Sequence, residues 1–103
     1  MNSVRASHEH WRSVTKDRFS ETSFSVAHSF SFGSDLHTCE FYLSIPVSNG
    51  AVDYNEYYRV STELARSFAT DSQSCIAFAE ACRRREHDDL LLYEPGGRRG
   101  API

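Results

Sequence analysis

An unbroken alternation of large and small side chains runs from residue 24 to residue 32. Every even position holds phenylalanine, valine or histidine, and every odd position holds serine or alanine. Successive side chains of a β-strand point to opposite faces of the sheet, so this segment predicts a strand with one aromatic face and one face of small polar residues. We expect that strand to cover residues 21–32, and the fold therefore to contain a sheet with one buried face.

A second strand is expected over residues 36–47, joined to the first by a tight turn. With a two-residue loop at Ser34-Asp35, Phe30 lies opposite Cys39 and all the large side chains share one face. A loop one residue longer would set the aromatic face of one strand against the mixed polar face of the other, which argues against it. The expected buried face comprises Phe24, Val26, His28, Phe30, Cys39, Phe41, Leu43 and Ile45. The expected uncovered face comprises Ser25, Ala27, Ser29, Ser31, Thr38, Glu40, Tyr42 and Ser44.

The next segment has the features of an amphipathic helix. Asp53 and Glu56 have the spacing of a capping box, in which the first side chain accepts from first-turn amides and the second reaches back to the cap. Apolar side chains then recur at steps of three and four residues. We expect a helix over residues 54–69 that covers the aromatic face of the hairpin. Its apolar stripe comprises Tyr57, Val60, Leu64 and Phe68.

A second helix and a short last strand complete the expected elements. Asp71 is placed to cap a helix over residues 72–86. A strand is the alternative for residues 75–82, which also alternate, but alanines at positions 77, 79 and 81 favour helix. The apolar run over residues 90–93 is bounded by glycine and proline and predicts a strand beside the hairpin.

The length of 103 residues supports one small domain, and a composition of 40% hydrophobic and 13% aromatic residues is too rich for a disordered chain. The predicted fold class is α+β, a hairpin and a short strand packed by one or two helices. Residues 1–18 are a polar N-terminal segment in which Val4, Trp11 and Val14 have nearly helical spacing, which predicts a short helix there. Residues 19–95 form the domain, and residues 96–103 form a flexible tail.

Net charge and apolar content exclude several classes of partner. A net charge of −3 argues against a nucleic-acid partner, because binding to phosphates needs a basic surface. No apolar run approaches the roughly 20 residues of a membrane span, and the N-terminus lacks the apolar core of a signal peptide, so we expect a cytoplasmic protein. Three cysteines make a disulfide framework improbable. Lys16 is the one lysine among eleven basic residues, which indicates a GC-rich bacterial or phage genome.

Tyrosine and arginine side chains are the candidate partner-binding residues, because these types anchor protein interfaces. On the expected helix at most two of the tyrosines at positions 54, 57 and 58 can face the sheet, so at least one is expected to face solvent or a partner. The alternative is that these tyrosines pack on the loop at 50–52 or cover Trp11. The arginine cluster at 83–85 is the one basic cluster, and contact with nucleic-acid phosphates through it is an alternative function. Its alternative is a solvated helix end with pairs such as Glu80 to Arg84. The candidates are Tyr54, Tyr57, Tyr58, Arg59, Arg83, Arg84 and Arg85.

A metal site or an enzyme is the alternative from another class. His28, His37 and Cys39 could converge on the hairpin, but zinc sites usually show tight ligand pairs, and this chain has none. No motif for a nucleophile, a phosphate loop or a zinc protease is present. We therefore expect no metal, no cofactor and no catalytic residue.

The sequence thus favours a small non-enzymatic protein-protein interaction module of the inhibitor, immunity or phage anti-defence type. Its partner is expected to be a protein, bound through the tyrosine and arginine residues and the serine face. An exposed strand edge is also a template for pairing, so a homodimer is a further expectation.

Overall fold

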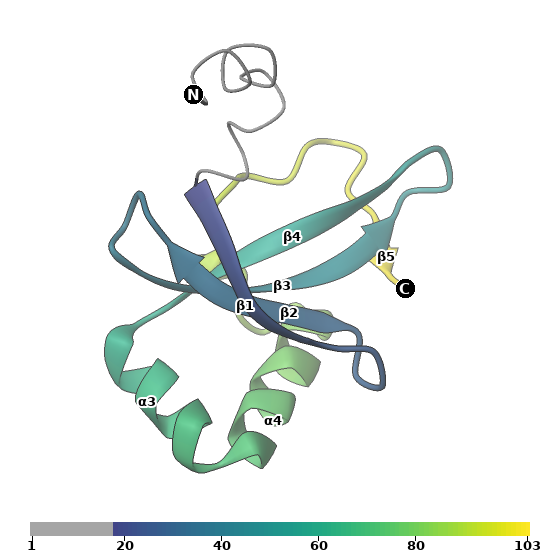
Figure 1. Ribbon diagram of the computed structural model, residues 1–103. Coiled ribbons are helices and arrows are strands. Elements are labelled where there is room, and N and C mark those ends of the chain that lie inside the picture. The colour runs from purple at the N-terminus through teal and green to yellow at the C-terminus, as the bar shows by residue number, and fades with distance from the viewer. Residues whose placement is uncertain (1–17) are drawn as a thin grey trace, which may run out of the picture.

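A four-stranded antiparallel sheet in the order β1-β2-β3-β4 forms the centre of the structure, with two helices on one face (Figure 1). The computed structural model describes residues 18–103, so the expectations for residues 1–17 lie outside the described part. The α+β class is confirmed. The elements are β1 (Phe19–Ser25), β2 (Phe30–Asp35), β3 (Glu40–Ser48), β4 (Asp53–Val60), α3 (Thr62–Thr70), α4 (Ser72–Arg83), the 3₁₀ helix η1 (Asp88–Leu90) and β5 (Ala101–Pro102).

The single strand predicted over residues 21–32 is wrong, because the chain reverses direction inside it. β1 ends at Ser25, residues 26–29 form a turn, and β2 begins at Phe30. The Ser25 Oγ accepts a hydrogen bond of 3.1 Å from the backbone N–H of His28. Ser29 closes the turn with a φ of 52°. Glycine or asparagine usually occupies such a position, so the residue types give little sign of this turn.

The turn between β2 and β3 has the same construction and lies later than predicted. Ser34 and Asp35 belong to β2, and residues 36–39 form the turn. Asp35 Oδ1 accepts from the backbone N–H of His37 at 3.0 Å, and Cys39 has a φ of 62°. The predicted register is therefore wrong.

Leu43 lies opposite Phe32 rather than Val26, a shift of six residues. Because this shift is even, the aromatic side chains of β2 still share a face with the apolar side chains of β3, as predicted.

Residues 53–60 form strand β4, so the helix predicted to begin at residue 54 is wrong in its first half. β4 pairs with β3 along its whole length. Asn49 makes the turn between them, because its Oδ1 accepts from the backbone N–H groups of Ala51 and Val52 at 2.9 Å each. Ser61 caps α3 instead of Asp53, its Oγ accepting from the N–H of Leu64. Aromatic and β-branched residues favour the strand over residues 54–60.

The second helix is confirmed and the last strand is displaced. Asp71 caps α4 as predicted, accepting from the N–H of Gln73 at 3.0 Å, and the helix ends at Arg83 rather than residue 86. Residues 90–93 form no strand, and Leu91 makes a single bridge to Tyr58. The last strand is β5, within the expected tail, which pairs with β3 at residues 47–48, beyond the residues that β2 reaches.

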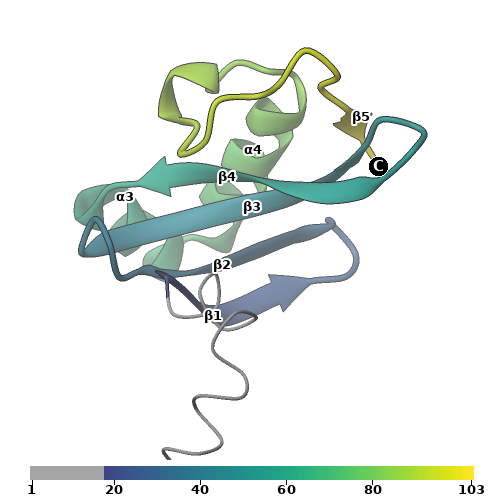
Figure 2. The ribbon, with the colours of Figure 1, turned by 90° about the horizontal axis from the view of Figure 1, so that it is seen from above.

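The hydrophobic core lies between the helices and the inner face of β3 and β4 (Figure 2). Alternate residues of these strands supply it, since neighbouring positions point to opposite faces. From the helices come Phe68 on α3 and a phenylalanine, an alanine and a cysteine on α4. Its buried members are Leu43, Ile45, Val47, Tyr58, Val60, Phe68, Phe78, Ala79 and Cys82.

The outer face of the sheet carries an aromatic cluster of Phe19, Tyr42, Tyr57 and Tyr93. The rings of Phe19 and Tyr57 stack at 4.1 Å, and Tyr42 packs against both. Tyr42 and Ser44 are 3% and 5% exposed, so the prediction that the serine face is uncovered is wrong at its centre.

Candidate functional site

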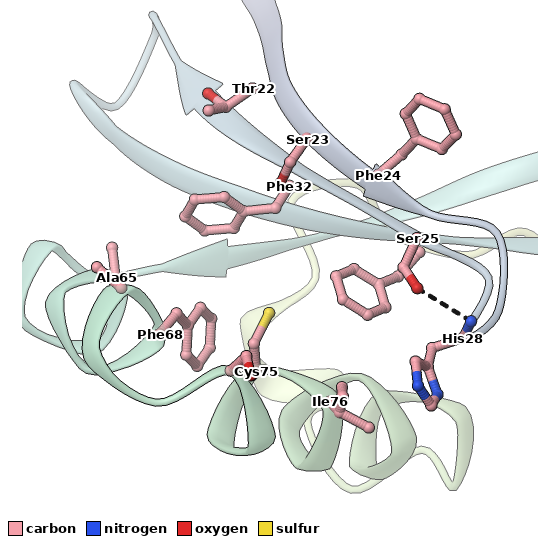
Figure 3. A pocket seen from close by; sticks show the side chains of 13 residues that line it. Thr22, Ser23, Phe24, Ser25, His28, Phe32, Ala65, Phe68, Cys75 and Ile76 are labelled. Carbon is pink, nitrogen blue, oxygen red and sulfur yellow. Dashed lines mark hydrogen bonds between the residues drawn. The ribbon is translucent and has the colours of Figure 1, made fainter.

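A pocket of about 400 Å³ opens between the β1–β2 hairpin and the two helices (Figure 3). This volume lies within the range of ligand-binding pockets in proteins. Phenylalanines from β2 and α3 form its apolar part, and the Phe32 and Phe68 rings meet edge to face at 5.8 Å. Its lining residues also include Thr22, Ser23, Phe24, Ser25, His28, Phe30, Ala65, Ala69, Ser72, Cys75 and Ile76.

A bulge in β1 explains why the pocket exists. Glu21 lies opposite Gly33, but Ser23 lies opposite Phe32, so Thr22 is an extra residue in the strand. An extra residue reverses which side chains point inward beyond it. Serines 23 and 25 therefore lie on the helix side, while Phe24 pairs with Ser31 and points away from the helices (Figure 3). Small side chains on β1 and Ala65 and Ala69 on α3 leave the space between them unfilled.

The pocket combines apolar surface with one imidazole, one thiol and a few hydroxyl groups. Burial raises the pKa of the Cys75 thiol, which lowers its fraction of reactive thiolate at neutral pH. The lining includes one imidazole, on His28, and four hydroxyl groups, but no carboxylate that could orient a base. Apolar surface with a few hydroxyl groups at its rim is typical of a binding site.

The outer edge of β1 lies beside this pocket. β1 pairs with β2 on one side, and no other strand within residues 18–103 pairs with its outer side. Two large apolar side chains are exposed at this end of the hairpin, Phe24 (63%) and Val26 (82%). Both were predicted to lie on the buried face, and that prediction is wrong because the bulge and the turn carry them outward. The outer edge of β1 and the pocket adjoin, because residues 22–25 line the pocket, and we call the edge and the pocket together the β1 surface.

The four predicted partner-binding residues at 54–59 lie on β4 instead of a helix. Tyr58 is fully buried in the core, where its hydroxyl donates to Glu56 Oε1 at 3.0 Å, so it offers no contact surface. Tyr57 points to the outer face and stacks on Phe19. Tyr54 packs on the core, and its hydroxyl accepts from the backbone N–H of Gly100.

Arg59 is the exposed member of the set and pairs with Glu40 at 2.8 Å. The structure thus distributes the four over both faces of the sheet, and the three predicted tyrosines do not form one exposed surface.

The predicted arginine cluster is also divided. Arg83 is largely buried, and its guanidinium donates to the backbone carbonyls of His28 and Ser29, which holds the β1–β2 turn against α4. Arg84 is exposed and pairs with Glu86 at 2.7 Å. Arg85 donates to the carbonyl of Gly100 at 3.0 Å.

The three-ligand cluster that was the alternative to an interaction module, formed by His28, His37 and Cys39, is not assembled in the structure. His28 lies in the turn before β2, whereas His37 and Cys39 lie in the turn after it, so the six residues of β2 separate them. At about 3.3 Å per residue that separation is near 20 Å. Over the described range 18–103, no group of three or more His, Cys, Asp and Glu side chains is placed to hold a metal ion.

Sequence patterns did not predict the residues of the pocket, because these residues lie far apart in the chain. Its apolar wall joins Phe32 to Ala65, Phe68 and Cys75, and no local pattern links residues so far apart in the chain. One signal was present. Residues 19–25 carry two large apolar side chains among seven, which is the composition of an edge strand rather than of a central one.

In the part of the chain that the structure describes, no helix has the length and apolar character needed to cross a membrane. Comparison of the chain with models of known protein families, with curated proteins and with solved structures found no match.

Proposed function

We propose that this protein is a non-enzymatic protein-binding module that accepts an extended segment of its partner along the outer edge of β1. In this mode the backbone of the added segment hydrogen-bonds to the free edge, and alternate side chains enter neighbouring pockets. The observation that supports the proposal is the continuity of the β1 surface. Residues 22–25 supply both the unpaired edge and one wall of the apolar pocket.

The side chains of β1 favour an added strand. Residues 20–24 are exposed, and Ser23 and Ser25 are small enough to let another backbone approach closely. Natural edge strands are usually protected by lysine, proline, inward-pointing charge or a bulge. β1 carries a bulge at Thr22 but has no lysine, proline or charge on its pocket side. A large apolar side chain of the partner would cover the half-buried Phe30 and Phe32, and burial of this apolar surface supplies the affinity.

The proposed function belongs to the class expected from the sequence, but the proposed binding surface is the edge of β1 and not the predicted tyrosine and arginine residues. Of the predicted residues, Arg59 and Arg84 are exposed and can contribute at the rim of an interface. An inhibitor, immunity or phage anti-defence role and a cytoplasmic location belong to the same proposal; the free state of Cys39, Cys75 and Cys82 is consistent with a reducing compartment. A second copy of the chain could use the same edge, and a homodimer is therefore the competing occupant.

An inward-pointing charge on β1 tests the proposal without altering the backbone of the hairpin. Ser23→Lys places an ammonium group beside the apolar pocket, where an added strand would have to bury it. The matched control is Ala77→Lys, an exposed position on α4 outside the pocket. The partner is first captured from the native host and purified, and its dissociation constant is then measured with each variant.

We expect Ser23→Lys to weaken binding by about tenfold or more, equivalent to about 1.4 kcal/mol, and Ala77→Lys to leave it unchanged. Equal affinity of both variants for the partner would place the binding surface elsewhere. A dimer in the wild type that Ser23→Lys converts to monomer, measured by light scattering, would assign the edge to a second copy instead.

A further inference from the structure

We propose that the protein has a second binding site, at the opposite edge of the sheet from β1, which takes a free aromatic amino acid. The site is a cavity of about 310 Å³ between the edge of β4 and residues 93–98, which we call the β4 cavity. This volume lies at the lower end of the range of small-molecule pockets. Because β1 and β4 are the two ends of the strand order, the inference does not depend on the proposed function.

The C-terminal segment runs beside β4 and is fixed at both ends of the β4 cavity (Figures 1 and 2). At one end, the backbone N–H of Leu92 donates to the Tyr57 carbonyl at 2.8 Å. At the other end, the Arg98 carbonyl accepts from Asn49 Nδ2 at 3.1 Å. Between these points, a Cβ atom added at Gly96 would meet nothing within 4 Å. The middle of the segment therefore stands clear of β4 and leaves the space open.

The edge of β4 offers a backbone donor and a backbone acceptor to this cavity. The Tyr57 carbonyl is directed outward, and alternate residues of a strand direct their backbone groups to the same edge. Asn55 therefore directs its N–H and C=O outward as well. Its partner on β3 is Pro46, which has no N–H to share with it. Asn55 lines the β4 cavity, and among residues 18–103 no strand pairs with this side of it.

Two opposite charges border the same cavity. Glu94 and Arg98 both line it and both are exposed. Within the described residues, neither side chain forms an ion pair. A ligand with a carboxylate and an ammonium group on one carbon atom satisfies both charges. Its carboxylate can also accept from the Asn55 N–H, and its ammonium group can donate to the Asn55 carbonyl. Free α-amino acids have this arrangement.

Tyrosine rings supply the apolar part of the β4 cavity, which favours an aromatic side chain on the ligand. Tyr57 and Tyr93 both line it, and their rings meet edge to face at 6.2 Å. The Tyr93 side chain is 51% exposed. A ligand ring on this surface buries apolar area and adds a favourable aromatic contact.

Three probes test the assignment by isothermal titration calorimetry of the full chain. They are L-phenylalanine, phenethylamine, which lacks the carboxylate, and hydrocinnamate, which lacks the ammonium group. We expect L-phenylalanine to bind at least about tenfold more tightly than either analogue, equivalent to about 1.4 kcal/mol. Arg98→Gln should weaken L-phenylalanine by about tenfold without weakening phenethylamine. Glu94→Gln should weaken L-phenylalanine by a similar factor without weakening hydrocinnamate.

Matched variants separate the β4 cavity from general charge and from the β1 surface. Arg84→Gln and Glu63→Gln remove exposed charges of the same types outside the cavity and should leave the affinities of all three probes unchanged. Ala69→Phe fills the apolar pocket beside β1 and should leave the affinity for L-phenylalanine unchanged. On titration with L-phenylalanine, the amide chemical shifts of Asn55 and Gly96 should change.

Absence of L-phenylalanine binding at millimolar concentration would overturn the proposal. Equal affinities of the three probes would show that the protein binds only the ring and would reject an amino-acid site. Weaker binding in Ala69→Phe, or unchanged amide shifts at Asn55 and Gly96, would place the ligand outside the β4 cavity. Equal losses in Arg98→Gln and Arg84→Gln would attribute the effect to general charge and also reject the site. None of these results bears on the Ser23→Lys test of the proposed function.

Discussion

The Asp35 carboxylate is a buried charge that fixes three parts of the chain at once. Its side chain is fully buried and accepts two hydrogen bonds from the Arg18 guanidinium. It also accepts from the backbone N–H of His37, which starts the turn between β2 and β3. A buried carboxylate is tolerable only when hydrogen bonds and an opposite charge replace its hydration. Asp35 therefore couples the entry of β1 to the end of β2.

The protonation of Asp35 makes stability depend on pH in the acid range. Burial alone raises the pKa of this carboxyl, but the hydrogen bonds from Arg18, His37 and Thr38 outweigh it and hold the pKa below its ordinary value of 3.8. A group whose pKa is lowered by folding stabilises the protein above its unfolded pKa, and that stabilisation is lost as the pH falls through the folded value. The contribution is thus complete at neutral pH and lost progressively below about pH 4.

Asp35→Asn tests this account at the level of one side chain. The amide can still accept from His37, but it leaves the Arg18 guanidinium, 13% exposed, without its counter-charge. We expect the free energy of unfolding at pH 7 to fall by about 3 kcal/mol, measured by urea denaturation, and the difference from wild type to shrink toward pH 3.

Glu40→Gln is the matched control for Asp35→Asn, because Glu40 forms an exposed pair with Arg59. An exposed pair contributes about 1 kcal/mol or less, so the loss in this variant should be small. A difference between wild type and Asp35→Asn that is the same at pH 7 and pH 3 would contradict the electrostatic account.

At the scale of elements, the bulge in β1 and Gly33 on β2 depend on each other. Gly33 lies opposite Glu21, immediately before the extra residue Thr22. A Cβ atom at position 33 would lie 2.8 Å from the Cα of Glu21 and closer still to the carbonyl oxygen of Ser20. The two backbones can approach this closely only because the residue on β2 is glycine. The orientation of Phe24 and the pocket therefore rest on one missing side chain.

Gly33→Ala should therefore move β1 away from β2. The neighbouring atoms belong to the backbone and cannot rotate aside, so we expect the free energy of unfolding to fall by about 3 kcal/mol. Gly97→Ala is the control, since a Cβ there meets nothing within 4 Å and should change stability by less than about 0.5 kcal/mol. Hydrogen exchange should show the amides of β1 losing protection first. Unchanged protection of β1 would contradict the proposed contact.

Side-chain periodicity predicted the common apolar face of β2 and β3, but neither the ends of the strands nor the outward positions of Phe24 and Val26. The alternation over residues 24–32 correctly predicted that the apolar side chains of β2 and β3 share one face of the sheet. The error of six residues in the register is even, so it leaves each side chain of these two strands on its predicted face. The turns were missed because Ser29 and Cys39 occupy positive φ, where glycine would have been the signal. Glu56 was interpreted as part of a helix cap, although its partner is Arg99, 43 residues away. No local pattern contains such a contact, and the pocket between β2, α3 and α4 was missed for the same reason.

At the scale of the whole molecule, Arg99 fastens the C-terminal segment to the domain. Its guanidinium contacts both carboxylate oxygens of Glu56 on β4, at 2.7 and 2.9 Å, and both of Asp88 on η1, at 2.8 and 3.0 Å. Glu56 is 6% exposed. The same contacts lower the pKa of Asp88. One residue later, the backbone N–H of Gly100 donates to the Tyr54 hydroxyl, and β5 then pairs with β3.

Arg99→Ala should release this segment and weaken the domain, because it leaves the buried Glu56 carboxylate with only the Tyr58 hydroxyl as a donor. We expect the free energy of unfolding to fall by about 3 to 5 kcal/mol. Hydrogen exchange should accelerate most at the amides of Gly100 and Ile103, the latter bonded to the Pro46 carbonyl. Arg98 is an exposed neighbour of the same type and provides the control. Arg98→Ala should change the free energy of unfolding by less than about 0.5 kcal/mol and leave the exchange of both amides unchanged. Equal losses in the two variants would show that Arg99 acts through general charge and not through its contact with Glu56.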